Sequence, residues 1–220
     1  MKKINIAIDG PSGAGKSSIS KILATQLNYV FINTGSFYRA LAYEMMNKNW
    51  TVEELIEELA NLNFLYENDE HLFLNGVNYS EFLRDPAISQ KASEISKHAE
   101  IRNHVNNYIT NLVKHNKGYI LEGRDTTFKV APNAELRLFM QASPDVRALR
   151  RTLQNETIGI HKDFKKVLEE VNFRDMQDST REVDPLHIAE GVIVLDNSSL
   201  TFDETVTKIL ELVNEKISGK

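Results

Sequence analysis

The stretch GPSGAGKSS, residues 10–18, decides the fold of this 220-residue chain. It fits the pattern of a glycine, four residues, a second glycine, a lysine and a serine or threonine. Glycines allow positive φ and a close backbone approach, so that several N–H groups point at one phosphate. The lysine places a positive charge beside the β and γ phosphate oxygens, and the helix that follows directs its positive N-terminal end at the phosphate. The pattern predicts an ATP or GTP site made of Gly10, Pro11, Ser12, Gly13, Ala14, Gly15, Lys16, Ser17 and Ser18, with Ser17 as a ligand of Mg²⁺.

The sequence around the loop predicts a strand before it and a helix after it. Residues 4–8 are short and rich in branched apolar side chains, and residues 17–27 place their apolar side chains on one face of a helix. Four further apolar runs, separated by helical stretches, read as strands: residues 29–32, 118–121, 136–140 and 192–195. Alternating strands and helices predict an α/β fold, a parallel sheet with helices on both faces.

Residues 63–84 interrupt this alternation. The segment has short alternating runs around Asn75-Gly76, a strong hairpin signal, and therefore predicts a small antiparallel insertion. By itself, such an insertion is better explained as a surface elaboration without function.

Composition excludes several classes of function. A net charge of -5 argues against a general nucleic-acid binder, and the absence of cysteine excludes disulfides and thiolate sites and favours an intracellular location. The histidines lack metal-binding spacing. The apolar run at the N-terminus is too short for a signal peptide, and no segment is long enough to span a membrane.

The acceptor of the phosphate needs other residues. A guanine-reading NKxD motif is absent, which argues against a GTPase. The strand YILEGRD, residues 119–125, ends in an arginine at the edge where ligands of α/β sheets bind, and this suggests a second anionic ligand.

Two predicted helices carry basic stripes. In SPDVRALRRTL, Ser143 and Pro144 form a helix start, and three arginines follow at i, i+3 and i+4 on one face: Arg147, Arg150 and Arg151. In VNFRDMQDSTREVDPL, a single helical stripe before Pro185 contains Arg174, Asp178 and Arg181. Each helix alone could carry a solvated salt-bridge face. Together with the phosphate loop, the stripes indicate a site for two facing polyphosphates.

Six stretches carry a family resemblance: IDGPSGAGKSS, NTGSFYRALA, EGRD, APNAELRLFMQASPDVRALRR, RDMQDSTREVDPL and VIVLDNSSLT. In this order and approximate spacing, over essentially the whole chain, they resemble bacterial cytidylate kinase. The resemblance implies a single P-loop kinase unit over residues 1–220, with a five-stranded parallel sheet, an inserted NMP-binding domain at 62–105 and a short lid at 150–165. It also implies ATP as phosphoryl donor with Mg²⁺, CMP or dCMP as acceptor, and a cytoplasmic monomer without nucleic-acid or membrane partners.

The same resemblance assigns the acceptor site. The CMP-binding residues would be Thr34, Tyr38, Arg39, Ser93, Arg102, Arg124, Asp125, Arg174 and Asp178. Arg39 and Arg124 would hold the acceptor phosphate, Arg174 and Asp178 would meet phosphate and sugar, and Ser93, Arg102 and Asp125 would read the cytosine edge. Transfer would rest on charge neutralisation by Lys16, Arg124, Arg150, Arg174 and Arg181. The metal would be held through Ser17 and water, with Glu122 in its outer shell.

Recognition of the cytosine base requires that Ser93 and Arg102 reach the same place. Cytosine offers an amine that an aspartate accepts from, and a carbonyl and ring nitrogen that serine and arginine donate to. Nine residues along a straight helix turn a side chain by about half a revolution, so Ser93 and Arg102 can converge only across a break. We predict this break at residues 98–100.

Two positions depart from the family pattern. Thr126-Thr127 replaces the usual apolar residue and glycine, which puts the loop conformation and base selectivity in question, and Asn33 stands where aspartate is common. The phosphate loop and the arginines are untouched, so retained chemistry is expected. A kinase for UMP, AMP or shikimate and a non-catalytic ATP sensor remain as alternatives, and the sequence leaves open the CMP to dCMP preference and tolerance of UMP.

Overall fold

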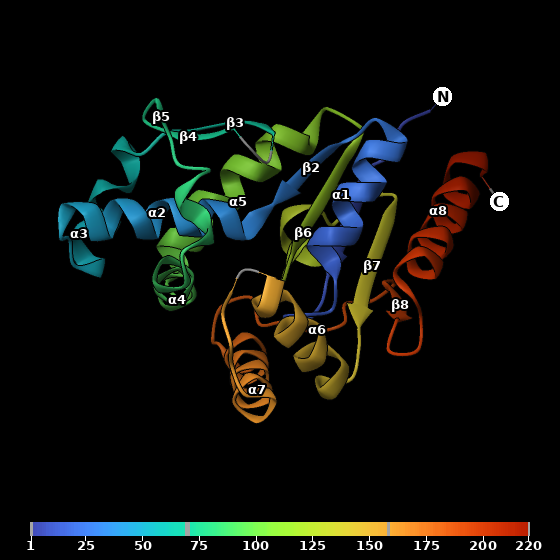
Figure 1. The fold of residues 1–220 in the computed structure, drawn as a ribbon. Helices are drawn as coiled ribbons and strands as arrows, with labels where there is room; N and C mark the ends of the chain where they lie inside the picture. The colour runs from blue at the N-terminus through green and yellow to red at the C-terminus, as the bar shows by residue number, and fades with distance from the viewer. Residues whose placement is uncertain (1, 69–70, 158, 220) are drawn as a thin grey trace.

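The computed structural model describes residues 2–68, 71–157 and 159–219. Residues 69–70 belong to the predicted insertion and residue 158 to the predicted lid, and these positions lie outside the described residues. A parallel five-stranded sheet, in the order β2-β6-β1-β7-β8, forms the centre (Figure 1). Its strands are β1 (Ile6–Asp9), β2 (Val30–Asn33), β6 (Tyr119–Gly123), β7 (Leu136–Gln141) and β8 (Ile193–Asp196).

Alternate side chains of the strands enter two separate cores, which produces three layers. Ile6 and Ile8 pack in the core under α1 (Lys16–Leu27) and α8 (Phe202–Ser218), whereas Ala7 enters the core under α2 (Thr34–Lys48) and α5 (Ala99–Lys114). A strand buried on both faces needs the apolar run seen in the sequence. All five predicted strands and the α/β fold class are confirmed. The first strand begins two residues later than predicted, at Ile6 rather than Ile4.

The insertion is an antiparallel sheet, as predicted, in the order β3-β4-β5. Asn75 and Gly76 join two of its strands with positive φ at both positions, 49° and 80°, as a tight hairpin turn requires. Phe64 packs edge-on against Phe37 of α2, which ties this sheet to the core. The elements of this region are β3 (Phe64–Asn68), β4 (His71–Leu74), β5 (Val77–Asn78), α3 (Val52–Glu58), α4 (Pro86–Ile95) and the 3-10 turns η1 (Leu59–Asn61) and η2 (Phe82–Arg84).

The predicted helix break exists but lies about two residues earlier. α4 ends at Ile95, and α5 begins at Ala99. His98 is the extended residue that caps α5, with φ −83° and ψ 128°, so the chain leaves the helical path at residues 96–98 rather than 98–100.

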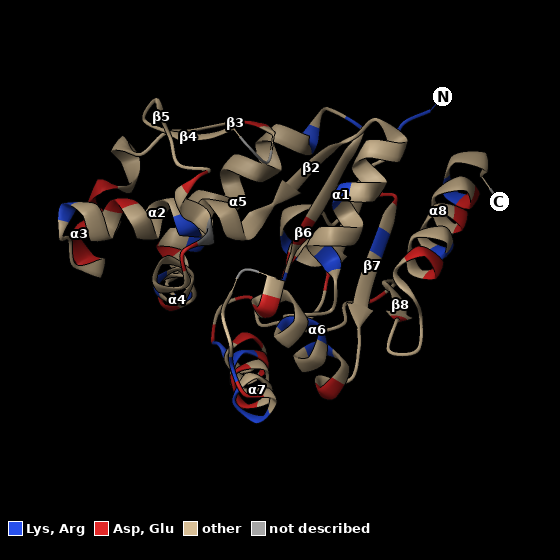
Figure 2. Cartoon of the chain, viewed as in Figure 1, with Lys and Arg blue, Asp and Glu red and all other residues tan. Residues whose placement is uncertain are grey.

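Helices α6 (Pro144–Thr157) and α7 (Phe164–Thr180) pack on each other beside the edge at which the parallel strands end (Figure 1). They share a small core of their own around Ala148, Val167 and Val171. α7 is dense in charges of both signs, whereas the sheet carries few (Figure 2). The predicted stripe is corrected here, because α7 ends at Thr180 and Arg181 is its extended cap, with ψ 146°. Among the described residues, no helix combines the length and apolarity that a membrane span needs.

Candidate functional site

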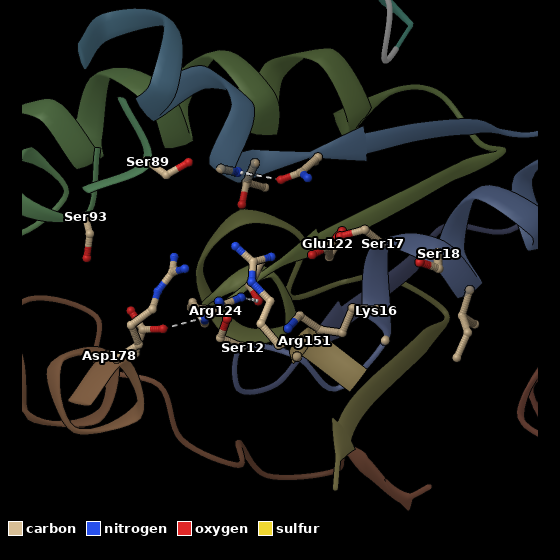
Figure 3. A pocket seen from close by; sticks show the side chains of 18 of the residues that line it. Ser12, Lys16, Ser17, Ser18, Ser89, Ser93, Glu122, Arg124, Arg151 and Asp178 are labelled. Carbon is tan, nitrogen blue, oxygen red and sulfur yellow. Dashed lines mark hydrogen bonds and ion pairs between the residues drawn. The ribbon is translucent and has the colours of Figure 1, made fainter. Parts of the chain in front are cut away.

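A cavity of about 700 Å³ lies at the carboxyl ends of the strands. The phosphate loop, α2, α4, α5, β6, α6, α7 and the segment after β8 all contribute to its lining. Figure 3 shows Ser89 and Ser93 of α4 at one end and Ser17 and Ser18 of α1 at the other, with Arg124 and Arg151 between them. The arrangement brings together segments from residue 12 to residue 205.

The phosphate loop has the backbone shape that the sequence predicted. Gly10 has φ 146°, and a Cβ there would lie 2.0 Å from the carbonyl oxygen of Met140, so only glycine fits. Gly15 caps α1 in the left-handed region with φ 88° and offers no side-chain cap. No acidic residue occupies the first turn of α1. The N–H groups at this helix end are therefore free to bind an anion.

Lys16 is buried at the cavity wall. Its Nζ donates to the carbonyl oxygens of Gly10 and Pro11, each at 2.7 Å. Burial and then the positive charge of Arg124 lower the pKa of Lys16, nearby carboxylates oppose both effects, and the net value is about 7. Among the described residues no carboxylate forms an ion pair with this ammonium, and a phosphate oxygen would supply that partner.

Six of the nine predicted loop residues line the cavity: Ser12, Gly13, Gly15, Lys16, Ser17 and Ser18. The other three do not, and they act through their carbonyl groups. Gly10 and Pro11 accept from Lys16, and Ala14 accepts from Nδ2 of Asn197 at 3.0 Å.

The middle of the cavity is lined by arginines, and one of them, Arg124, pairs with a neighbouring carboxylate. Nε of Arg124 donates to Oδ2 of Asp178 at 2.6 Å, and its Nη1 donates to the carbonyl oxygen of Gly123. Burial alone would lower the pKa of Arg124, but the Asp178 carboxylate reverses the direction and raises it. Arg174 has a lowered pKa, because of burial and then the charge of Arg124. The predicted group of Arg124, Arg174, Asp178 and Arg181 does line one cavity.

The far end of the cavity holds the predicted base-reading residues. Arg102 forms an ion pair with Asp125, and both side chains are at most 5% exposed. Nδ2 of Asn106 also donates to Oδ2 of Asp125, at 3.2 Å, and the guanidinium lies 5.8 Å from the ring of Tyr38. Ser93 lines the cavity as well, so the helix break brings it to the same cavity as Arg102, as predicted.

The start of α2 explains one departure from the family pattern. Oδ1 of Asn33 accepts from the backbone N–H of Gly35 at 3.0 Å and so caps the helix. Asparagine and aspartate cap about equally well, so the substitution keeps the local structure. Thr34 and Arg39 both line the cavity, and Nη2 of Arg39 donates to Oγ of Ser36 at 3.0 Å.

Thr126 and Thr127, the second departure, bind the buried carboxylate of Asp9 at the end of β1. Both backbone N–H groups and both hydroxyls donate to it, at 2.7 to 2.8 Å. Burial raises the pKa of Asp9, while these donors oppose the shift. The two threonines begin a π-helical turn, η3 (Thr126–Val130), that fixes the loop after Asp125 to the strand before the phosphate loop. The backbone freedom of a glycine is thus replaced by hydrogen bonds.

The three arginines predicted to form one basic face on α6 do not all line the main cavity. Arg147 does not line the main cavity: it donates to the carbonyl oxygens of Ser12 (3.0 Å) and Ala142 (2.8 Å) and pairs with Asp175. It therefore holds the phosphate loop from behind. Arg150 and Arg151 do line the cavity.

Sequence reasoning missed Asn197, which lies directly after β8. Its buried side chain donates to the carbonyl oxygen of Ala14 and accepts from Nη1 of Arg150 at 3.1 Å, so it connects the phosphate loop to α6. Its place at the carboxyl end of a strand, in VIVLDNS, is the signal that could have found it. Ser89, Ser96 and Gln154 were also not assigned and line the cavity.

A metal ion would depend largely on phosphate oxygens. The described residues contain no group of three or more metal-ligating side chains. Glu122 lines the cavity at the end where Ser17 lies (Figure 3), and its buried Oε2 has no partner among the described residues. An orphaned carboxylate oxygen suits a magnesium-bound water, because Mg²⁺ usually keeps several waters. The residues present therefore fit a hydrated Mg²⁺.

The charge of the lining contrasts with that of the chain. Three carboxylates face eight basic side chains in the cavity: Lys16, Arg39, Arg102, Arg124, Arg150, Arg151, Arg174 and Arg181. The whole chain has a net charge of -5. Such local concentration of positive charge is suited to bringing two polyanions together.

Comparison with known proteins gives a consistent result. A family model described as cytidylate kinase matches residues 6–215. The chain is 52% identical to the cytidylate kinase of Mycoplasmopsis pulmonis (strain UAB CTIP), in an alignment that covers 100% of this chain and 99% of that protein. It is 44% identical to that of Mycoplasmopsis agalactiae (98% and 99% covered) and 41% identical to that of Caldicellulosiruptor saccharolyticus (100% of both).

Solved structures match the fold. A gluconokinase from Sinorhizobium meliloti aligns with a TM-score of 0.51 at 15% identity, covering 97% of this chain and 93% of that one. An uncharacterized protein from Eubacterium ventriosum aligns with a TM-score of 0.57 at 17% identity, covering 97% and 99%.

Proposed function

Because this chain belongs to the cytidylate kinase family, we propose that it transfers the γ-phosphoryl group of ATP to CMP or dCMP, giving ADP and CDP or dCDP. The single observation that carries the proposal is one cavity with a phosphate loop at one end and the buried Arg102–Asp125 pair at the other. Its arginine-rich middle suits the facing phosphates of a donor and an acceptor.

The donor nucleotide binds at the phosphate loop. The N–H groups of the loop and of the first turn of α1 hold the β-phosphate, and Lys16 exchanges its two carbonyl contacts for phosphate oxygens. Ser17 would hold Mg²⁺ directly and Glu122 would hold it through water, and the metal would supply neutralisation of the phosphate charge.

The acceptor occupies the far end. Arg39 and Arg124 bind its phosphate, together with Arg174, and Thr34 and Tyr38 complete the wall beside it. Asp178 accepts from a sugar hydroxyl while its other interaction orients Arg124.

Base selection rests on Ser93, Arg102 and Asp125. Asp125 accepts from the cytosine amine, and Arg102 and Ser93 donate to the carbonyl and ring nitrogen. Uracil presents an acceptor in place of the amine and a donor at the ring nitrogen, so the same groups disfavour UMP.

Transfer requires alignment and charge neutralisation, not a protein base. The acceptor oxygen is already anionic, so no proton has to be removed before it attacks the γ-phosphorus in line with the leaving ADP oxygen. Lys16, Arg124, Arg150, Arg174 and Arg181 offset the charge of the transferring group.

Two segments close over the reactants in this proposal. Residues 62–105 form the acceptor-binding domain, and residues 150–165 form a lid that excludes water and limits hydrolysis of ATP. The α6 and α7 pair has a small core of its own, separate from the two cores that cover the sheet. Hydrogen exchange in residues 150–165 is expected to slow when both nucleotides bind. Equal exchange with and without nucleotides would remove the lid from the mechanism.

We also place the enzyme in pyrimidine nucleotide metabolism, as a cytoplasmic monomer. Light scattering during gel filtration tests the oligomeric state, with a mass near 25.1 kDa expected for a monomer.

The deciding experiment is a coupled assay of ADP formation with CMP, dCMP, UMP and AMP in turn. CMP-dependent turnover above that with UMP and AMP is expected, and Lys16→Ala should abolish it. Asp125→Ala should reduce the preference for CMP over UMP more than it weakens ATP binding. Absence of CMP-dependent turnover overturns the proposal. A non-catalytic ATP sensor would instead keep its ATP affinity and its signalling in Arg124→Ala.

A further inference from the structure

Asp184 is a charged residue in an unfavourable backbone position. It has φ 46° in the left-handed region and precedes Pro185, which restricts its backbone further. Aspartate tolerates this region better than most residues, but a non-glycine residue there still costs conformational energy. Such positions persist where surrounding contacts hold them, and those contacts show what the strain maintains.

The side chain of Asp184 holds Arg102. Oδ2 of Asp184 accepts from Nε of Arg102 at 3.1 Å, and the Asp184 side chain is only 14% exposed. The guanidinium is also fixed at its two other nitrogens, because Nη1 donates to the carbonyl oxygen of Ser96 at 3.1 Å and Nη2 donates to Asp125. A guanidinium has five N–H groups in a rigid plane. Three contacts around that plane leave one N–H on Nη1 and one on Nη2 for a ligand.

The backbone of Asp184 holds a second cavity arginine. Its carbonyl oxygen accepts from Nε of Arg181 at 2.9 Å and also from Nη2 of the same side chain. On the outer side, Lys129 approaches Oδ1 of Asp184 at 3.8 Å. The segment after α7 thereby connects Arg102, at the base-reading end of the cavity, to Arg181, which the proposal places near the reacting phosphates.

We propose that Asp184 is a positioning residue that makes the acceptor site selective for cytosine, by holding Arg102 in the orientation that donates to the cytosine ring. This inference rests on the proposed function and adds a residue to it. Without Asp184, Arg102 would keep its Nη contacts with Asp125 and the Ser96 carbonyl oxygen, but its Nε would lose its acceptor and the guanidinium could swing about its Nη end. The second carboxylate, at Nε, fixes the plane of the guanidinium.

The orientation decides selectivity because cytosine and uracil differ at the ring nitrogen. Cytosine accepts a hydrogen bond there, whereas uracil carries a hydrogen that would face the donating guanidinium. A guanidinium free to turn away relieves that conflict with UMP and loses its bond to CMP. Loss of Asp184 should therefore affect the two acceptors in opposite senses or to unequal degrees.

Asp184→Gly tests this with the backbone preserved, because glycine adopts the left-handed conformation and the carbonyl bond to Arg181 can persist. We expect the KM for CMP to rise about tenfold, the loss that follows from removing one hydrogen bond to a charged group. The ratio of kcat/KM for CMP to that for UMP should fall about tenfold, and the KM for ATP should stay within about twofold. Asp184→Asn tolerates the same φ and keeps an acceptor without the charge, so it should rescue part of the selectivity.

Lys129→Met is the matched control, because it removes only the outer partner of Asp184 and should keep the wild-type CMP to UMP ratio. A purely structural role for Asp184 would lower turnover with both acceptors equally, and a wild-type ratio in Asp184→Gly would overturn the inference. If Asp184→Gly fails to fold, a wild-type ratio in Asp184→Asn together with unchanged KM for CMP overturns it instead. A wild-type enzyme without preference for CMP would overturn the proposed function itself, which is a different result.

Discussion

Lys16 should make ATP binding strongly dependent on pH. In the free protein, burial and then the Arg124 charge lower the pKa of the Lys16 ammonium to about 7, so the side chain is half neutral near that pH. The β and γ oxygens of a bound nucleotide favour the charged form and raise the pKa in the complex. The complex therefore binds more protons than its separate components, and its affinity must fall as pH rises through about 7.

The size of the pH effect follows from the pKa of about 7 for Lys16 in the free protein. With Lys16 titrating at about 7 when free and remaining charged when bound, the affinity should fall about fiftyfold between pH 7 and pH 9. At pH 8, binding should take up about nine tenths of a proton. The unfolding free energy of the ligand-free protein has the opposite dependence: the unfolded chain keeps Lys16 protonated up to about pH 10.5, so this group makes the folded protein more stable as pH rises above 7.

Isothermal titration with ADP or a non-hydrolysable ATP analogue and Mg²⁺ measures both quantities. Titrations in buffers with different ionisation enthalpies count the protons taken up. Lys16→Met keeps the length of the side chain without a proton to gain, so its affinity should be low and independent of pH. Equal wild-type affinity at pH 7 and pH 9, without proton uptake, would show that Lys16 is fully charged in the free protein and would refute the reasoning.

Three further outcomes are expected. Arg124→Ala should raise the KM for CMP by about tenfold or more and weaken ATP binding less, because Arg124 is placed on the acceptor phosphate and oriented there by Asp178; an equal loss of ATP affinity in titration would contradict this. Thr127→Val removes the hydroxyl bond to buried Asp9 and should cost about 2 kcal/mol, seen as a fall of about 4 to 8 °C in Tm, while Thr127→Ser retains Tm. Glu122→Gln should raise the Mg²⁺ concentration for half-maximal activity about threefold or more, and an unchanged magnesium curve would exclude Glu122 from the metal's outer shell.

Much of the fold could be predicted because its signals are local. Buried parallel strands need continuous apolar runs of residues. In the loop at residues 10–18, the positive φ angles fall on glycines, Gly10, Gly13 and Gly15, so its backbone conformation can be predicted from the sequence. The hairpin at Asn75-Gly76 is equally local, since only residues that accept positive φ can make that turn. Strand limits were less predictable, because Ile4 is as apolar and as buried as Ile6, but its N–H donates to the hydroxyl of Tyr29 and not to a neighbouring strand.

The site was predicted less completely, because the direction in which a side chain points depends on packing between segments that are distant in the sequence. Helical periodicity places Arg147 near Arg150, but it does not say that Arg147 turns behind the phosphate loop to pair with Asp175 of another helix. Asn197 and Asp184 lie in segments without periodicity, and their contacts are 183 and 82 residues away in the chain. Long-range partners of this kind cannot be read from the spacing of residues in one segment.

The directions of the pKa shifts separate the cavity arginines into two groups with different tasks. Burial lowers the pKa of five of them, but Tyr38 and Asp125 reverse the shift for Arg102, and Asp178 reverses it for Arg124, so that both values are raised. Each has a carboxylate that fixes its orientation in addition to the charge it supplies, and in the proposed function they lie where the base and the acceptor phosphate must be aligned. Arg150, Arg174 and Arg181 keep lowered pKa values, and among the described residues no carboxylate is paired with them. A bound polyanion offsets the positive charges of these three arginines, so they contribute electrostatic attraction to nucleotide binding. Binding energy and geometric selection thus reside on different side chains of the same cavity.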